Sequence, residues 1–177
     1  MKKLTGKRER KRTGYSITEL PLALLILFVF GAFPLMALSL TALRMAFVNL
    51  TCNEAVRAAA GTQTFSLAQT AAKTTVANLS QAFTGLAYNF QGGSNGSLSI
   101  YQTPLSPNGP PDPQPYNGGP IQTSQYLYQY QLSMPTQIQP ILQYSGGLFG
   151  NVPGWSAPIQ MNVTASAYCE NPQGLNQ

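Results

Sequence analysis

The residues of this chain whose types and spacing could do chemistry lie at one short junction near the amino end. Seven of the ten basic residues precede Gly14, and Glu19 stands five residues beyond it. Glu19 also opens an uncharged apolar run from Leu20 to Leu43. Because a carboxylate near the start of a membrane helix is costly to bury, it usually has a charged partner. The chemical question at this junction is therefore what neutralises Glu19.

A cut in the chain after Gly14 would provide that partner. It would remove the basic residues and leave Tyr15 with a free α-amino group, which is largely protonated near neutral pH. This amine could pair with Glu19 of its own chain or of a neighbouring helix, and both charges would then be satisfied out of water. The alternative is that Glu19 lies at the headgroup level of an uncut anchor, where water solvates it.

The sequence around the junction resembles the type III signal of type IV pilins and pseudopilins, a glycine followed after four residues by a glutamate: Gly14-Tyr15-Ser16-Ile17-Thr18-Glu19-Leu20. The resemblance implies that Gly14 precedes the scissile bond of a prepilin peptidase. Tyr15 would be the new terminus, which is often N-methylated, and Glu19 would be the assembly glutamate. Pro21 departs from the aromatic and aliphatic residues that are more usual there in major pilins.

An alanine- and arginine-containing stretch, Glu54 to Gly61, follows the apolar run. Together with the junction it resembles the TadE-like family of minor pilins, over roughly residues 8–61. This resemblance implies a subunit of a Tad or type IV-like pilus or secretion filament.

The element that must position the junction is the apolar run. Its 24 residues are enough to cross a bilayer, which requires about 20. The basic residues on its amino side predict a cytoplasmic amino end and an extracytoplasmic carboxyl-terminal part. A secretory signal cut near Ala37-Leu38-Ser39 is the other possibility, but such signals have apolar cores of only about 7–15 residues. Within the run, Pro34 is expected to kink or locally melt the helix.

The fold expected for the whole chain is α+β, with a long membrane-spanning helix and a second, amphipathic helix packed on a small antiparallel sheet. Apolar residues recur at helical spacing from Ala72 through Val76, Leu79, Phe83 and Leu86 to Phe90. This helix is expected to open at Thr64 or Ser66, where Ser66 and Gln69 would form a capping box. The expected segments are a basic leader at 1–14, a helix and its extension at 15–61 (membrane span about 20–43), an amphipathic helix at 62–90, a Gly/Pro-rich loop at 91–120 and a β-rich head at 121–177.

Strand patterns are found at 97–102, 125–133 and 159–168. The row Tyr126, Tyr128 and Tyr130 is interpreted as a cross-strand ladder, with an adhesive patch as the alternative. Pro135 and Pro140 are expected to confine the residues between them to an edge or a loop.

The two cysteines, Cys52 and Cys169, would both lie in an oxidising compartment if the topology is correct. A disulfide between them would close a long loop and tie the last strand to the first helix. Free thiols or an intermolecular link are the alternatives, because sequence does not give the distance between the two residues.

Composition argues against most other functions. The chain carries a net charge of +5, but residues after Gly14 carry three basic and four acidic side chains, so nucleic-acid binding is not expected. With no histidine and two cysteines, neither a metal site of nitrogen and sulfur ligands nor a Ser/His or Cys/His catalytic pair can be assembled. We therefore expect no enzyme activity, no cofactor and no small-molecule substrate.

The sequence thus predicts a non-enzymatic minor pilin or pseudopilin of the inner membrane, which could also reach a surface filament after assembly. Its expected partners are a prepilin peptidase, an assembly platform and other pilin-like subunits, in secretion or adhesion. The rival hypothesis is a signal-anchored envelope protein that is never processed and carries an adhesive or binding head.

Overall fold

The computed structural model describes residues 19–83, 88–90, 96–106, 112–139 and 157–176. The fold is α+β, with one long apolar helix near the amino end and a small antiparallel sheet, as the sequence predicts. The chain divides after Met36 into two compact units. Each unit is considered by itself below.

The first unit is helical throughout its described part. It contains α1 (Glu19–Leu27), the π-helical turn η1 (Phe28–Ala32) and the start of α2 (Phe33–Ala60). Its side chains are almost all apolar, and the large ones are exposed. A helix that is apolar on every side has no preferred inner face, which is expected of a segment surrounded by lipid.

In the second unit, two helices follow one another in the chain. α2 ends at Ala60, directly before the expected stop at Gly61, and α3 runs over Phe65–Ala82. Thr64 is the N-cap of α3, because its hydroxyl accepts a hydrogen bond from the Leu67 backbone N–H at 3.3 Å. The predicted capping box between Ser66 and Gln69 was therefore wrong. Ser66 lies inside the first turn and bonds to the Thr64 hydroxyl instead.

The second helix is shorter than its apolar stripe predicts. α3 ends at Ala82, and Tyr88–Phe90 form the short strand β1 rather than a last helical turn. Phe83 is the C-cap, and its ring lies 4.4 Å from that of Phe47 in α2. Leu86, another member of the predicted stripe, lies outside the described residues. A tilted aromatic pair thus joins the end of α3 to α2.

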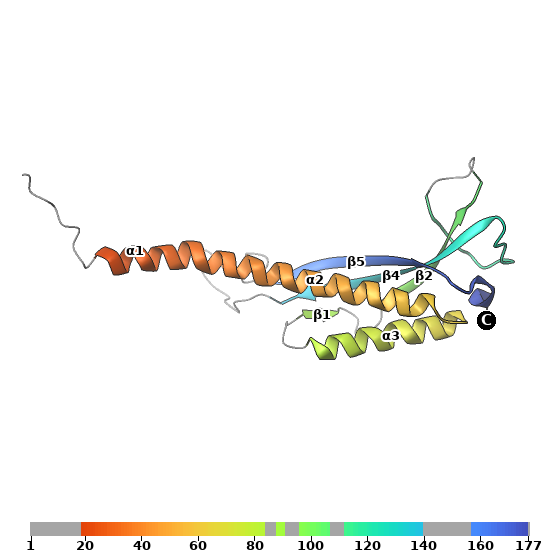
Figure 1. Ribbon diagram of the computed structural model, residues 1–177, viewed down its shortest axis with the longest axis horizontal. Coiled ribbons are helices and arrows are strands. Elements are labelled where there is room, and N and C mark those ends of the chain that lie inside the picture. Colours follow the sequence, from red (N-terminus) through yellow and green to blue (C-terminus); the bar gives the residue numbers. More distant parts are fainter. Residues whose placement is uncertain (1–18, 84–87, 91–95, 107–111, 140–156, 177) are drawn as a thin grey trace, which may run out of the picture. The chain divides into compact units, whose positions relative to one another are not determined.

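The sheet is antiparallel and is organised around one long strand, β4 (Tyr126–Ile138). β5 (Ile159–Tyr168) pairs with β4 along its whole length. β2 (Ser97–Pro104) pairs with Tyr126–Ser133, and β1 pairs with Thr136–Ile138. β3 (Gln114–Pro115) adds a short pairing to β2. β4 and β5 lie along the carboxyl-terminal half of α2 (Figure 1).

The register corrects one expectation about the prolines. The segment after Pro135 is neither an edge nor a loop, because Thr136–Ile138 pair with β1 on one side and with β5 on the other. Among the described residues, Pro135 faces the break where β2 has ended and β1 has not begun. A missing N–H can therefore be accommodated inside a central strand. Pro140 lies outside the described residues.

The core lies on the inner face of this sheet. All the even-numbered residues of β4 from Tyr128 to Ile138 are buried, and Tyr128 and Tyr130 are only 2% and 1% exposed. Phe65 stacks on Tyr130 with ring centroids 6.1 Å apart, and Tyr116 meets Tyr128 edge-on at 5.5 Å. The tyrosine row is therefore a core element, and the adhesive-patch alternative is contradicted for Tyr128 and Tyr130.

Helix α2 makes direct contact with the backbone of the sheet. Its inward face carries mostly small side chains, which allow close approach: Val48, Thr51, Cys52, Ala55, Val56, Ala59 and Ala60. The thiol of Cys52 donates to the carbonyl oxygens of Leu132 and Val163, at 3.7 and 3.8 Å. Further along, the Glu170 N–H donates to the Ala60 carbonyl at 3.1 Å. α3 contributes Ala68, Ala72 and Val76 to the same apolar cluster.

The carboxyl-terminal turn, η4 (Pro172–Asn176), packs on the α2–α3 connection. Asn171 donates a side-chain bond to the Gln63 carbonyl at 3.2 Å. A Cβ on Gly174 would lie far inside contact distance of that same carbonyl oxygen, which belongs to the backbone and cannot simply rotate away. The close approach of two backbones therefore requires glycine at this position.

We expect Gly174→Ala to destabilise the head by about 1–3 kcal/mol, the usual cost of overpacking a close contact. Gly119→Ala is the matched control, because nothing lies within 4 Å of a Cβ placed there. Urea unfolding followed by circular dichroism measures both variants. Equal midpoints for the two would contradict the packing of η4 on Gln63.

Candidate functional site in the membrane helix and its junction with the head

The cleavage residues predicted from the sequence, Gly14 and Tyr15, lie outside the described residues. Glu19 is the first described residue of α1. Glu19 directly precedes the apolar residues of this helix in the chain, and its assembly role stays a prediction.

That surface is extensive. The exposed large apolar side chains between residues 20 and 43 are Leu20, Leu22, Leu24, Leu25, Ile26, Leu27, Phe28, Val29, Phe30, Leu35, Met36, Leu38 and Leu43. Moving one such side chain out of water is worth about 1.5–3 kcal/mol, so together they represent tens of kcal/mol. Only 6% of the most apolar window is buried within the protein, which argues against the core helix of a soluble domain. The described helix Leu20–Ala60 is long and apolar enough to cross a membrane.

The predicted disturbance at Pro34 is found one turn earlier, as the π-helical turn η1. Here the Phe33 N–H donates to the Phe28 carbonyl, five residues back instead of four. Proline has no N–H, and its ring crowds the carbonyl four residues before it, that of Phe30. The wider π turn relieves this crowding while keeping the backbone bonded, which apolar surroundings demand. The kink or local melting expected at Pro34 itself stays a prediction.

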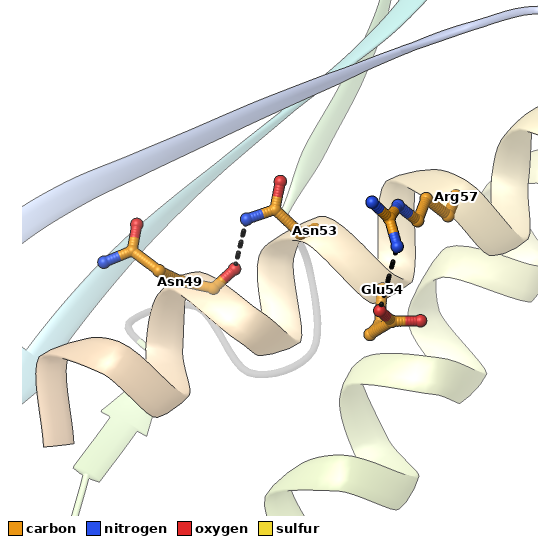
Figure 2. A network of polar contacts seen from close by, with 4 residues as sticks. All are labelled: Asn49, Asn53, Glu54 and Arg57. Carbon is orange, nitrogen blue, oxygen red and sulfur yellow. Dashed lines mark hydrogen bonds and ion pairs between the residues drawn. The ribbon is translucent and has the colours of Figure 1, made fainter. Parts of the chain in front are cut away.

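Beyond the apolar run, the outward face of α2 is polar and largely bonded to itself (Figure 2). Asn53 donates to the Asn49 carbonyl at 2.9 Å, and Arg57 pairs with Glu54 at 3.5 Å. An ion pair this exposed contributes little to stability. This face is therefore a solvated helix surface, with no cluster of groups that suggests catalysis.

Arg44 is different, because it is only 7% exposed. One guanidinium nitrogen, Nη1, donates to the backbone carbonyl of Gln139 at 3.0 Å, and Nε is buried without a hydrogen-bond partner. Arg44 is the first charged residue after the apolar run. Sequence analysis counted this residue in the charge balance but did not identify its contact with the end of β4.

The structure keeps the two cysteines apart as free thiols. Cys52 lies against the β4–β5 backbone near Val163 and Ala165, whereas Cys169 follows the end of β5. Both thiols are free in the structure, so the predicted bridge is not present.

Cys169 instead lies within hydrogen-bonding reach of the phenol of Tyr130. Burial raises the pKa of Cys169, and the bond from Tyr130 opposes that rise in part. Burial also raises the pKa of Tyr130, with the neighbouring Cys169 adding to the effect. Both groups are therefore neutral at physiological pH, and the thiol is a poor nucleophile.

Alkylation tests this arrangement. At pH 8 in the folded protein we expect no reaction at Cys52 and slow reaction at Cys169, since a raised pKa leaves little thiolate. In urea without reductant both cysteines should react. The mass of the alkylated protein gives the number of modified thiols, and comparison with the Cys169→Ser variant shows which thiol reacted. Two thiols that react in urea only after reduction would show that the cysteines are bridged after all.

The same pKa shifts predict a pH dependence of stability. A group whose pKa is raised by folding favours the folded state fully below its unfolded pKa, and this contribution is lost as the pH rises. For Cys169 and Tyr130 the free energy of unfolding should therefore fall above about pH 8.5–10, the range of their unfolded pKa values. The double variant Tyr130→Phe with Cys169→Ser should flatten this fall in urea titrations. An unchanged slope would contradict the assignment.

Comparison of the chain with protein-family models, with curated proteins and with solved structures found no match.

Proposed function

We propose that this protein is a non-enzymatic minor pilin or pseudopilin, processed after Gly14 and assembled through its amino-terminal helix. The observation that carries the proposal is the exposed apolar surface of α1, η1 and the start of α2, which begins directly at Glu19. A surface of this size needs lipid or other apolar helices around it. A carboxylate at its edge needs a cation, and cleavage after Gly14 would create one.

The continuity of the helix supports this proposal over a secretory signal. Peptidases act on extended chain, but α2 is unbroken across residues 37–39. The Thr41 hydroxyl adds a bond to the Ala37 carbonyl within this stretch, at 2.9 Å. Beyond it, the same helix carries the side chains that pack on the sheet, so it joins the membrane segment directly to the head.

The proposed topology is a single pass through the inner membrane, with the amino end cytoplasmic and the head outside. We further propose that α3 covers the inner face of the sheet, beside α2. The stacking of Phe65 on Tyr130 and the shared apolar cluster of Ala72, Val76 and Leu132 support this arrangement. The proposed partners are a prepilin peptidase, an assembly platform and other pilin-like subunits.

Replacement of Gly14 tests the processing step. We expect Gly14→Ile to leave the full-length precursor in the membrane, because the bulky side chain would stand next to the scissile bond. Gly6→Ile, inside the same leader, should be processed normally and is the matched control. Amino-terminal sequencing of the native protein checks the site. A terminus at Tyr15 supports the proposal, one at Met1 supports the unprocessed anchor, and one near Leu40 supports a secreted form.

Replacement of Glu19 tests the assembly step separately. Glu19→Ala should be processed as usual but enter filaments poorly, because the new amine would have no carboxylate partner in apolar surroundings. Glu54→Ala removes an exposed carboxylate from the same long helix and should assemble normally. Quantitative blotting of sheared filaments measures incorporation. Equal incorporation of the two variants would remove the role proposed for Glu19.

A further inference from the structure

The environment of Arg44 suggests an interaction that the proposed function does not include. The side chain is 93% buried, and the one hydrogen bond recorded for it runs from Nη1 to the Gln139 carbonyl. Nε is buried with no acceptor. A guanidinium group has five N–H donors, and within the described residues one bond is recorded for them.

No carboxylate of the described head is placed to neutralise this charge. Glu54 pairs with Arg57, and the backbone of Glu170 bonds to Ala60, sixteen residues further along α2 than Arg44. Asp112 precedes β3, which pairs with the end of β2 furthest from Gln139. An anion for Arg44 would therefore have to come from outside the described head.

The position of Arg44 along the chain indicates which anion this is. The uncharged run before it has 24 residues, or about 36 Å of helix, compared with about 30 Å of hydrocarbon in a bilayer. If Glu19 lies at the cytoplasmic boundary, Arg44 lies at the level of the outer headgroups. Phosphate is the dominant anion there, and the planar fork of arginine fits it.

The contact with Gln139 also sets the position of the sheet. Gln139 directly follows β4, and Ile138 pairs with Ile159 at the start of β5. Further along α2, Cys52 bonds to Leu132, and Ala60 bonds to Glu170 beyond the end of β5. The sheet therefore has one end near Arg44 and its other end along the helix, away from the apolar run.

We propose that the end of the sheet formed by Ile138, Gln139 and Ile159 rests on the outer surface of the membrane, with Arg44 bound to a phospholipid phosphate. This proposal rests on the membrane insertion proposed above. It does not depend on cleavage after Gly14, so it can be tested in the uncut precursor. The head then begins at the lipid surface, with no stalk between them.

A pair of fluorophores tests the placement. Gln160 and Ser166 are both exposed, on the same face of β5, six residues or about 20 Å apart. Each is changed to cysteine in a Cys169→Ser background, labelled with a nitrobenzoxadiazole dye, and the full-length precursor is reconstituted in phospholipid vesicles. A nitroxide on a trace of lipid headgroups should quench the dye at 160 severalfold more than at 166. Equal quenching would overturn the placement.

The role of Arg44 needs its own comparison. Arg44→Gln should lower quenching at 160 toward the value at 166, and Arg44→Lys should have a smaller effect because it keeps the charge. Protection of Cys52 from alkylation shows that each variant is folded. Unchanged quenching in a folded Arg44→Gln protein would refute the phosphate contact.

A measurement on the unchanged Arg44 covers the case in which the variant does not fold. Vesicles of galactosyl diglycerides contain no phosphate apart from the trace probe, so quenching at 160 should fall in them. If added inorganic phosphate restores it, the site takes free phosphate, and the lipid proposal is wrong. If quenching is the same in both lipids, phosphate has no role.

Discussion

The constraint on which the rest of this structure depends is that one continuous helix must satisfy two different surroundings. Up to Leu43 every side of the helix is apolar or small, and the large side chains are exposed. After Arg44 the helix has two faces, a buried one of small side chains and a solvated one that includes Asn49 and Asn53. The helix surface changes from apolar to two-faced within one turn, and the buried Arg44 lies at this change.

The small residues of α2 determine how the head is stabilised. Alanines at positions 55 and 59 and Cys52 allow the helix to approach the sheet so closely that a thiol reaches two strand carbonyls. Larger side chains would hold the helix off and open voids in the core. The large core volume comes from the sheet instead, through Tyr128, Tyr130, Leu132 and Met134. The core of the head thus combines small side chains from α2 with large side chains from β4.

Sequence patterns predicted the positions of helices and strands better than they predicted which residues are buried or in contact. The apolar run, the stop before Gly61 and strands near 97–102, 125–133 and 159–168 follow from periodicity and propensity, which are local properties. The tyrosine row was recognised, but its burial depends on which helix covers it. The bridge from Cys52 to Cys169 failed for a related reason, because the distance between the two residues is set by strand register and helix contact.

The errors at Phe90 and Pro135 show how a neighbouring strand overrides a local signal. Phe90 continues a helical stripe, but its strand pairs with Thr136 of β4. That pairing in turn begins just after Pro135, so both misjudged residues belong to the same piece of sheet. A local sequence pattern covers only a few neighbouring residues. A strand that pairs with them from far away in the chain can therefore decide their secondary structure, whether the pattern favours a helix or a loop.

The same distinction applies to the candidate site. Gly14, Glu19 and Pro34 could be proposed from sequence, because each proposal depends on neighbours in the chain: basic residues before, apolar residues after. Arg44 could not, because its one recorded bond reaches Gln139, ninety-five residues away. Without that bond it is an ordinary charge at the end of a membrane segment. With it, the charge that ends the apolar run also contacts the end of the central strand.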